Sequence, residues 1–296
     1  MRWLELDEAT FRDYYNRKPF LFRHRLAEHP LLQLPRLFEL ALRHPREEVL
    51  HWRGNIPVDA DIDHAQENHG AGLRLEDSIA NIAASGSYVL IRNAQLDPAY
   101  GGLLGDILGE IEPLFRPLDS QMDDRVAYVF IAAPGSITPY HMDRDINFLF
   151  QLHGNKRVHV WDPWDREVLS ETGLETLFAR YDAPRPAFKE EYQGRAQVFE
   201  LKPGLGVHQP FTAPHLVKND DNVSASISAT FRSQAARRKA GVHLVNHGLR
   251  RIGLEPTPYG TSPVRDSVKF AALRAYRFAK ARLGAKPPPQ TGPYRA

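Results

Sequence analysis

The sequence contains no cysteine, only 3 methionines, and no apolar run as long as a membrane-spanning helix, which needs ~20 residues. Without cysteine the chain forms no disulfides and no thiolate metal sites, and it has no cysteine nucleophile. Any metal ion must therefore be held by histidine and carboxylate side chains. The first residues, Met1 to Glu8, are acidic and include no hydrophobic signal segment. We therefore expect a cytoplasmic protein that does not associate with a membrane.

What the sequence does contain is typical of a globular protein. Its 296 residues are 42% hydrophobic and 25% charged, and this length is sufficient for one large domain or two small ones. The net charge of +2 hides an uneven distribution: residues 1–231 contain 24 Lys and Arg against 34 Asp and Glu, whereas residues 232–296 contain 14 against 2. The basic tail is either a solvated helical surface packed on the acidic body or a contact for nucleic acid or an acidic partner. We favour the first and do not expect nucleic-acid binding.

The first 125 residues mix helix and strand patterns, and we expect them to form a segment that packs on the rest of the chain. Apolar spacing predicts helices over residues 35–44, 77–85 and 103–111, and a strand over 87–92. Residues 56–72 are rich in Asp, His, Asn and Gly, which predicts a long loop. Long loops in compact domains are often functional.

From residue 126 the pattern changes to short runs rich in β-branched and aromatic residues. Seven such runs predict strands: Val126–Ala132, Asp145–Leu152, Lys156–Trp161, Gln197–Leu201, Gly206–Gln209, Pro214–Lys218 and Val223–Phe231. Several alternate apolar and polar residues, as half-buried antiparallel strands do. So many short strands predict a sandwich or a jelly-roll barrel over residues 126–232. The tail, 233–296, predicts two helices, the second over 264–283, and a frayed end at 286–289.

One pair of residues in the strand-rich region suits a metal ion. In extended chain His141 and Asp143 point to the same side, so both can bind one ion. A His-x-Asp pair arises by chance about once in a chain this rich in both residues, so the pair alone is weak evidence. Two histidines and one carboxylate form the facial triad of non-haem Fe(II) oxygenases. His215, at the start of a later predicted strand, and His208 are both candidates for the third ligand.

Lys156 lies at the start of the predicted strand Lys156–Trp161, thirteen residues after Asp143. A lysine inside a barrel is costly unless it meets an anion. A dicarboxylate cosubstrate would supply that anion, and the hydroxyl of Thr138 would add a hydrogen-bond donor. The alternative is an exposed strand lysine with no role in binding.

The stretch from Thr138 to Arg157, followed by Pro163, resembles the core of the JmjC-type, cupin-like 2-oxoglutarate oxygenases. It is especially similar to the asparaginyl hydroxylase that acts on hypoxia-inducible factor. The order Thr-Pro-x-His-x-Asp, then Asn, then Gly-x-Lys, then Pro-His carries this resemblance, which extends over about residues 130–232. The resemblance implies a mainly β fold with flanking helices: a double-stranded β-helix core plus C-terminal helices, all in one catalytic unit.

The resemblance also assigns roles to individual residues. It implies that His141, Asp143 and His215 bind Fe(II), and that Lys156 and Thr138 bind the distal carboxylate of 2-oxoglutarate. Three more residues are carried over as cosubstrate contacts: Asn147, near the metal-chelating end, Tyr128, as a candidate for a tyrosine at the distal carboxylate, and Thr230, where the asparaginyl hydroxylase has a second asparagine.

The function that the resemblance implies is hydroxylation of an unactivated C–H bond with 2-oxoglutarate and O₂. We expect the substrate to be an amino-acid side chain of a protein or peptide, with a free amino acid or another small metabolite as the alternative. Hydroxylation is favoured over demethylation because the chain is short and has no Cys/His zinc module. A catalytically inactive cupin-like binding protein and a metal-dependent isomerase are the competing classes. In the resembling hydroxylases the C-terminal helices form a dimer interface, which implies a homodimer here.

Overall fold

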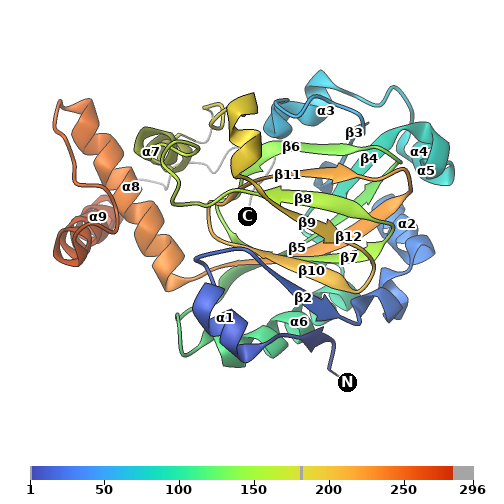
Figure 1. Ribbon diagram of the computed structural model, residues 1–296, viewed down its shortest axis with the longest axis horizontal. Helices are drawn as coiled ribbons and strands as arrows, with labels where there is room; N and C mark the ends of the chain where they lie inside the picture. Colours follow the sequence, from blue (N-terminus) through green and yellow to red (C-terminus); the bar gives the residue numbers. More distant parts are fainter. Residues whose placement is uncertain (1, 181–182, 283–296) are drawn as a thin grey trace.

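The computed structural model describes residues 2–180 and 183–282. In these residues the strands form two antiparallel sheets that face each other (Figure 1). The large sheet has the strand order β1-β2-β10-β7-β12-β5-β4-β3, and the small sheet has the order β6-β11-β8-β9. The protein is therefore mainly β with flanking helices, as the sequence predicts.

The core of the fold is a double-stranded β-helix whose consecutive strands alternate between the two sheets, except that β8 and β9 both lie in the small sheet. The large sheet contributes β5 (Asp123–Ala132), β7 (Ile146–His153), β10 (Leu205–Gln209) and β12 (Ser224–Arg232). The small sheet contributes β6 (Ile137–Met142), β8 (Lys156–Val160), β9 (Gln197–Leu201) and β11 (Pro214–Asn219). Eight strands wound in this way form a jelly roll, which confirms the predicted fold class.

The N-terminal segment extends the large sheet at both edges. Strands β1 (Leu4–Glu5) and β2 (Phe20–His24) continue it beside β10, and β3 (Val49–Arg53) and β4 (Ser87–Ile91) continue it beside β5. The α-helices of this segment are α1 (Glu8–Tyr14), α2 (Leu34–Arg43), α3 (Ala65–Asn68), α4 (Leu75–Ala80), α5 (Ile82–Ser85) and α6 (Pro98–Phe115). The short 3₁₀ helices of the chain are Leu26–Glu28, Pro30–Leu32, Arg46–Glu48, Ile62–His64, Ala94–Leu96 and Glu190–Arg195.

Helix α6 shows how the sequence fixes one of these elements. The Asp97 side chain accepts a hydrogen bond from the backbone N–H of Ala99, and Pro98 occupies the first turn, where its missing N–H costs nothing. The helix buries Ile107 and Ile111 against the hydrophobic core. Burying one such side chain contributes about 1.5–3 kcal/mol, so packing rather than helix propensity holds α6 in place.

The structure corrects some of the predicted elements. The predicted helix over 77–85 is two short helices, because the backbone leaves the helical conformation at Asn81 (φ −131°, ψ 44°). Strand β6 is missing from the predicted strands because it contains Pro139; proline is tolerated there because β6 is an edge strand of the small sheet. Strands β1 to β3 and helix α7 (Glu171–Ala179) were also not predicted.

The C-terminal helices α8 (Gln234–Arg251) and α9 (Pro263–Arg282) confirm the predicted helical tail and project from the barrel beside α7 (Figure 1). Ser233 caps α8 by accepting a hydrogen bond from the backbone N–H of Ala236. The end of the predicted second helix, Leu283, and the predicted frayed end lie outside the described residues. In the described part of the chain we find no helix with the length and apolar character needed to cross a membrane.

Candidate metal centre and cosubstrate pocket

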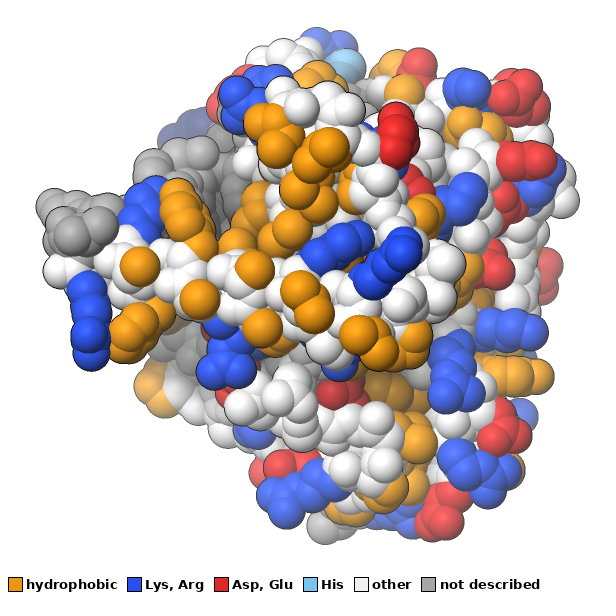
Figure 2. All heavy atoms as spheres, turned by 90° about the vertical axis from the view of Figure 1, so that its left-hand side faces the viewer, with side chains coloured by type: hydrophobic (Ala, Val, Ile, Leu, Met, Phe, Trp, Pro, Cys, Tyr) orange, Lys and Arg blue, Asp and Glu red, His pale blue; other side chains and the backbone are white. Residues whose placement is uncertain are grey.

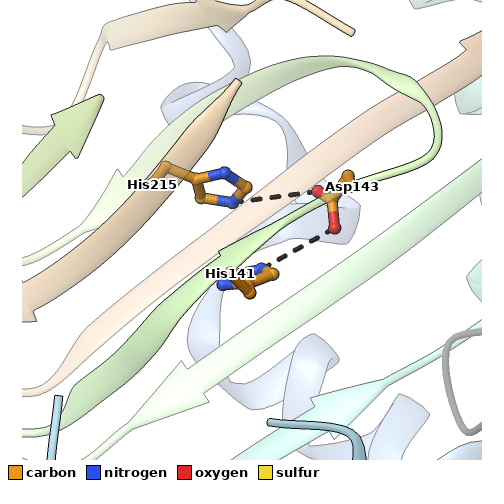
Figure 3. A group of neighbouring side chains, drawn as sticks. All are labelled: His141, Asp143 and His215. Carbon is orange, nitrogen blue, oxygen red and sulfur yellow. Dashed lines mark ion pairs between the residues drawn. The ribbon is translucent and has the colours of Figure 1, made fainter. Parts of the chain in front are cut away.

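The candidate metal ligands come from two neighbouring strands of the small sheet. His141 lies on β6, Asp143 directly follows that strand, and His215 lies on β11, where it pairs with His141 in the strand register. The Nε2 atom of His141 is 3.7 Å from Asp143 Oδ1, and Nε2 of His215 is 3.8 Å from Asp143 Oδ2 (Figure 3). One ligand atom from each residue lies within 4.8 Å of the others. The register of β6 and β11 thus brings together all three predicted ligands.

Both histidines are oriented for metal binding through Nε2. Nδ1 of His141 lies 2.7 Å from the carbonyl of Pro139, and Nδ1 of His215 lies 3.0 Å from that of Ala213. A neutral imidazole that donates through Nδ1–H keeps its lone pair on Nε2, as metal-binding histidines commonly do.

The protonation states of these groups also fit a cation. Burial, reinforced by His215, lowers the pKa of His141 to about 3, so its ring is neutral. Burial by itself raises the pKa of Asp143, but His141, His215 and Arg185 together outweigh it, and the pKa is lowered. Two imidazoles and one carboxylate are a donor set that fits Fe(II) and leaves other coordination positions open.

His208 lies elsewhere, in the aromatic core. It is fully buried, its Nε2 accepts a hydrogen bond of 3.0 Å from the backbone N–H of Asn16, and its ring lies 4.9 Å from that of Phe20 and 4.6 Å from that of Phe148. Its hydrogen-bonding capacity is used within the core. The geometry therefore favours His215 as the third ligand.

A pocket opens at the triad and extends into the barrel. Lys156, only 5% exposed, lines this pocket and donates a hydrogen bond of 2.9 Å from Nζ to Ser226 Oγ. Burial lowers the pKa of Lys156 to about 7. The hydroxyls of Tyr88 and Thr138, 2.8 Å apart, line the same pocket. A buried ammonium with several hydroxyls is a site that suits a carboxylate.

A second cluster of polar side chains in the pocket comes from three adjacent strands. Asn147 on β7 pairs in the strand register with Gln209 on β10 and with Thr230 on β12. Its Nδ2 donates a hydrogen bond of 2.7 Å to Gln209 Oε1. Within the described residues, Asn147 Oδ1, Gln209 Nε2 and Ser228 Oγ are buried without a hydrogen-bond partner. Such atoms in a native fold indicate a place for water or a polar ligand. Thr230 lines the pocket and donates to the carbonyl of Val126.

Several residues that line this pocket were not predicted from the sequence. Ser226 and Ser228 carried a signal, because they alternate with Thr230 on one face of a predicted strand. Tyr88 carried none, because β4 reaches the barrel only through its pairing with β5. The predicted Tyr128 lies in the pocket as well, and burial raises its pKa. The pocket therefore holds two tyrosines, of which Tyr88 contacts Thr138.

The fold and the site together define a double-stranded β-helix protein with a His-Asp-His candidate metal centre. No protein-family model matches the chain. The HSPB1-associated protein 1 homolog of Danio rerio is 30% identical over 115 residues, which are 36% of this chain and 26% of that protein. HSPB1-associated protein 1 of Rattus norvegicus is 28% identical over 109 residues, 34% of this chain and 23% of that protein. The matched part of the chain thus spans about a quarter of the length of these relatives.

Solved structures with similar folds include the ribosomal oxygenase YcfD of Escherichia coli, at 15% identity and a TM-score of 0.44, covering 94% of this chain and 68% of that one. A complex of YcfD with cobalt and 2-oxoglutarate gives 14% identity and a TM-score of 0.45, covering 95% and 69%. These structures are similar to this chain in fold. The similarity to the asparaginyl hydroxylase stays a prediction.

Proposed function

We propose that the protein is an Fe(II)- and 2-oxoglutarate-dependent oxygenase that hydroxylates an unactivated C–H bond. One observation carries this proposal: a single pocket contains both the metal triad and a buried lysine with hydroxyl neighbours. The triad suits a metal with open positions, and the buried Lys156 suits a dicarboxylate. An inactive binding protein would have no need for the two sites in one pocket.

Different residues of the pocket would bind the two ends of 2-oxoglutarate. When bound, Fe(II) supplies a centre at which the 2-oxo acid chelates and O₂ is activated. The distal carboxylate of 2-oxoglutarate would be held by Lys156, Ser226 and Thr138. The side-chain amide of Gln209 has an N–H without a partner among the described residues, and it would donate to the metal-chelating end of 2-oxoglutarate. The apolar side chains of Phe130, Leu149 and Val217 line the pocket and limit access of water. The balanced reaction converts 2-oxoglutarate, O₂ and a substrate C–H into succinate, CO₂ and the alcohol.

The test of this activity is the conversion of 2-oxoglutarate to succinate by the purified protein with Fe(II) and O₂. We expect His141→Ala and Asp143→Ala to abolish it. His159→Ala is the matched control: His159 is also a buried histidine of the small sheet, but it contacts Gln193 and does not line the pocket. Absence of both iron binding and turnover would refute the oxygenase assignment. A metal-dependent isomerase would form no succinate and would act on its own substrate without O₂.

The substrate that we propose is an amino-acid side chain of a protein or peptide, and the cellular location is the cytoplasm. The names of the relatives, ribosomal oxygenase and HSPB1-associated protein, agree with a protein substrate. Mass spectrometry of lysate peptides and metabolites, treated with active protein or with His141→Ala, would identify species that gain one oxygen atom. If only a free metabolite gains oxygen, the protein substrate is wrong, and release of formaldehyde would indicate demethylation.

We also propose that the protein is a homodimer through α8 and α9. Helix α9 leaves Val264, Val268, Tyr276 and Phe278 more than half exposed. Figure 2 shows the side of the molecule with these helices, where hydrophobic side chains gather among Lys and Arg. Light scattering of the full chain should give twice the monomer mass, and Val268→Asp should reduce it. A monomeric mass for the unmodified protein would refute the dimer.

A further inference from the structure

The predicted loop over 56–72 contains the 3₁₀ helix Ile62–His64 and helix α3, and its residue Asp63 connects it to the metal centre. Asp63 forms a bidentate ion pair with Arg185, in which Nε lies 2.7 Å from Oδ2 and Nη2 lies 2.7 Å from Oδ1. The Arg185 side chain is 6% exposed and that of Asp63 is 15% exposed. Such a pair joins loop 56–72 to the segment 183–189, which lies far from it in the sequence. Fork-to-fork geometry between two largely shielded side chains fixes the position of the guanidinium.

The third nitrogen of the same guanidinium points at the His-x-Asp motif. Nη1 of Arg185 donates a hydrogen bond to the backbone carbonyl of Met142, the residue between the two ligands. The same atom lies 4.0 Å from Oδ1 of Asp143, the oxygen that also faces His141. Arg185 thus contacts the backbone of the motif and lies beside the carboxylate.

Asp143 is the residue of the triad that lies outside a strand and is the most exposed. It follows the last residue of β6 and its side chain is 23% exposed, whereas the side chains of His141 and His215 are 5% and 6% exposed and both residues lie within paired strands. Its backbone is therefore the part of the triad that the sheet holds least. A planar guanidinium that hydrogen-bonds to both oxygens of Asp63 and to the carbonyl of Met142 can hold this turn, whereas the ammonium of a lysine cannot reproduce the fork.

We infer that Arg185, held in place by Asp63, is a positioning residue for Asp143, and that loop 56–72 thereby sets the metal affinity of the site. The inference rests on the proposed function only in that it takes the triad to be a metal site. Partners outside the ligand set that orient metal ligands are typically responsible for about 10- to 100-fold in metal affinity. We therefore expect the loss of either member of the pair to weaken metal binding in this range.

The experiment is a Co(II) titration of the ligand-free protein, followed by the visible absorption of the bound ion. Asp63→Asn keeps the shape of the side chain and removes its charge, and Arg185→Lys keeps the charge and removes the fork. Each should weaken Co(II) binding about tenfold or more. The double variant should bind Co(II) about as weakly as the single variant with the lower affinity, because the pair acts as a unit. The control is Arg250→Lys, which breaks a comparable pair with the buried carboxylate of Glu175.

A purely structural role would give a different result. Breaking a buried ion pair lowers the melting temperature in the control and in both variants, but only the pair with Asp63 should change the Co(II) affinity and spectrum of the folded protein. Co(II) affinities within about twofold of the unmodified protein for folded Asp63→Asn and Arg185→Lys would overturn the inference. If Arg185→Lys does not fold, Asp63→Asn decides the question alone. Unmodified protein that binds Co(II) without converting 2-oxoglutarate would refute the oxygenase only, whereas no Co(II) binding would refute both.

Discussion

Replacing Lys156 with methionine should stabilise the ligand-free protein and weaken its binding of 2-oxoglutarate. Lys156 is 5% exposed and lies on an inner strand of the small sheet. Among residues 2–180 and 183–282, its ammonium donates a hydrogen bond to the hydroxyl of Ser226 alone. Methionine has a similar length and no charge to bury. The variant therefore removes a destabilising charge together with the group that we expect to bind the cosubstrate.

The size of the effect follows from the pKa of Lys156. Burial lowers it from 10.5 to about 7. A difference of about 3.5 pKa units corresponds to about 5 kcal/mol of destabilisation of the charged form. Between pH 7 and 10.5 the unfolded chain binds this proton and the folded chain does not, so the stability of the unmodified protein rises with pH in this window. The destabilisation is thus full below pH 7 and absent above pH 10.5.

Methionine also loses the hydrogen bond to Ser226, which offsets about 1–2 kcal/mol. We expect Lys156→Met to be more stable than the unmodified protein by about 3 kcal/mol near pH 6.5, and this advantage to disappear by about pH 10. Urea unfolding of both proteins across this pH range measures the difference in their free energies of unfolding. Groups that titrate in the same way in both proteins do not contribute to this difference. The control, Lys202→Met, replaces an exposed lysine and should show no such pH dependence. A Lys156→Met variant that is less stable than the unmodified protein at pH 6.5 would refute this reasoning.

Three further predictions concern the pocket, the aromatic core and the metal. Tyr88→Phe removes the hydroxyl that contacts Thr138 and should raise the KM for 2-oxoglutarate about tenfold with little change in kcat, as measured by succinate formation; a fall in kcat alone would contradict a binding role. His208→Ala should lower the free energy of unfolding by about 2–4 kcal/mol and leave the Co(II) affinity unchanged, since His208 packs in the core; weaker Co(II) binding would instead favour it over His215 as a ligand. Removal of metal with a chelator should stop succinate formation, and Fe(II) but not Zn(II) should restore it.

The sequence predicted those elements whose signal is local. Strand β12 shows alternation along its own length, and helix α8 has its own cap at Ser233. Local signals failed where a neighbour decides the structure. Strand β6 contains a proline and is a strand because β11 pairs with it at the edge of the sheet. The predicted helix over 77–85 breaks at Asn81, which no cap or proline announces.

The sequence by itself determined the chemistry available to this protein. With no cysteine, a metal could be held only by histidine and carboxylate, and the two-residue spacing of His141 and Asp143 already placed two such ligands on one side of an extended chain. The tertiary structure decided which distant residues join them. Pairing of β6 with β11 placed His215, and not His208, beside His141 and Asp143. Pairing of β4 with β5 brought Tyr88 into the pocket, and loop packing joined Asp63 to Arg185. The physical reason is that side-chain direction within a strand follows from backbone geometry, whereas contacts between distant segments depend on the packing of the whole fold.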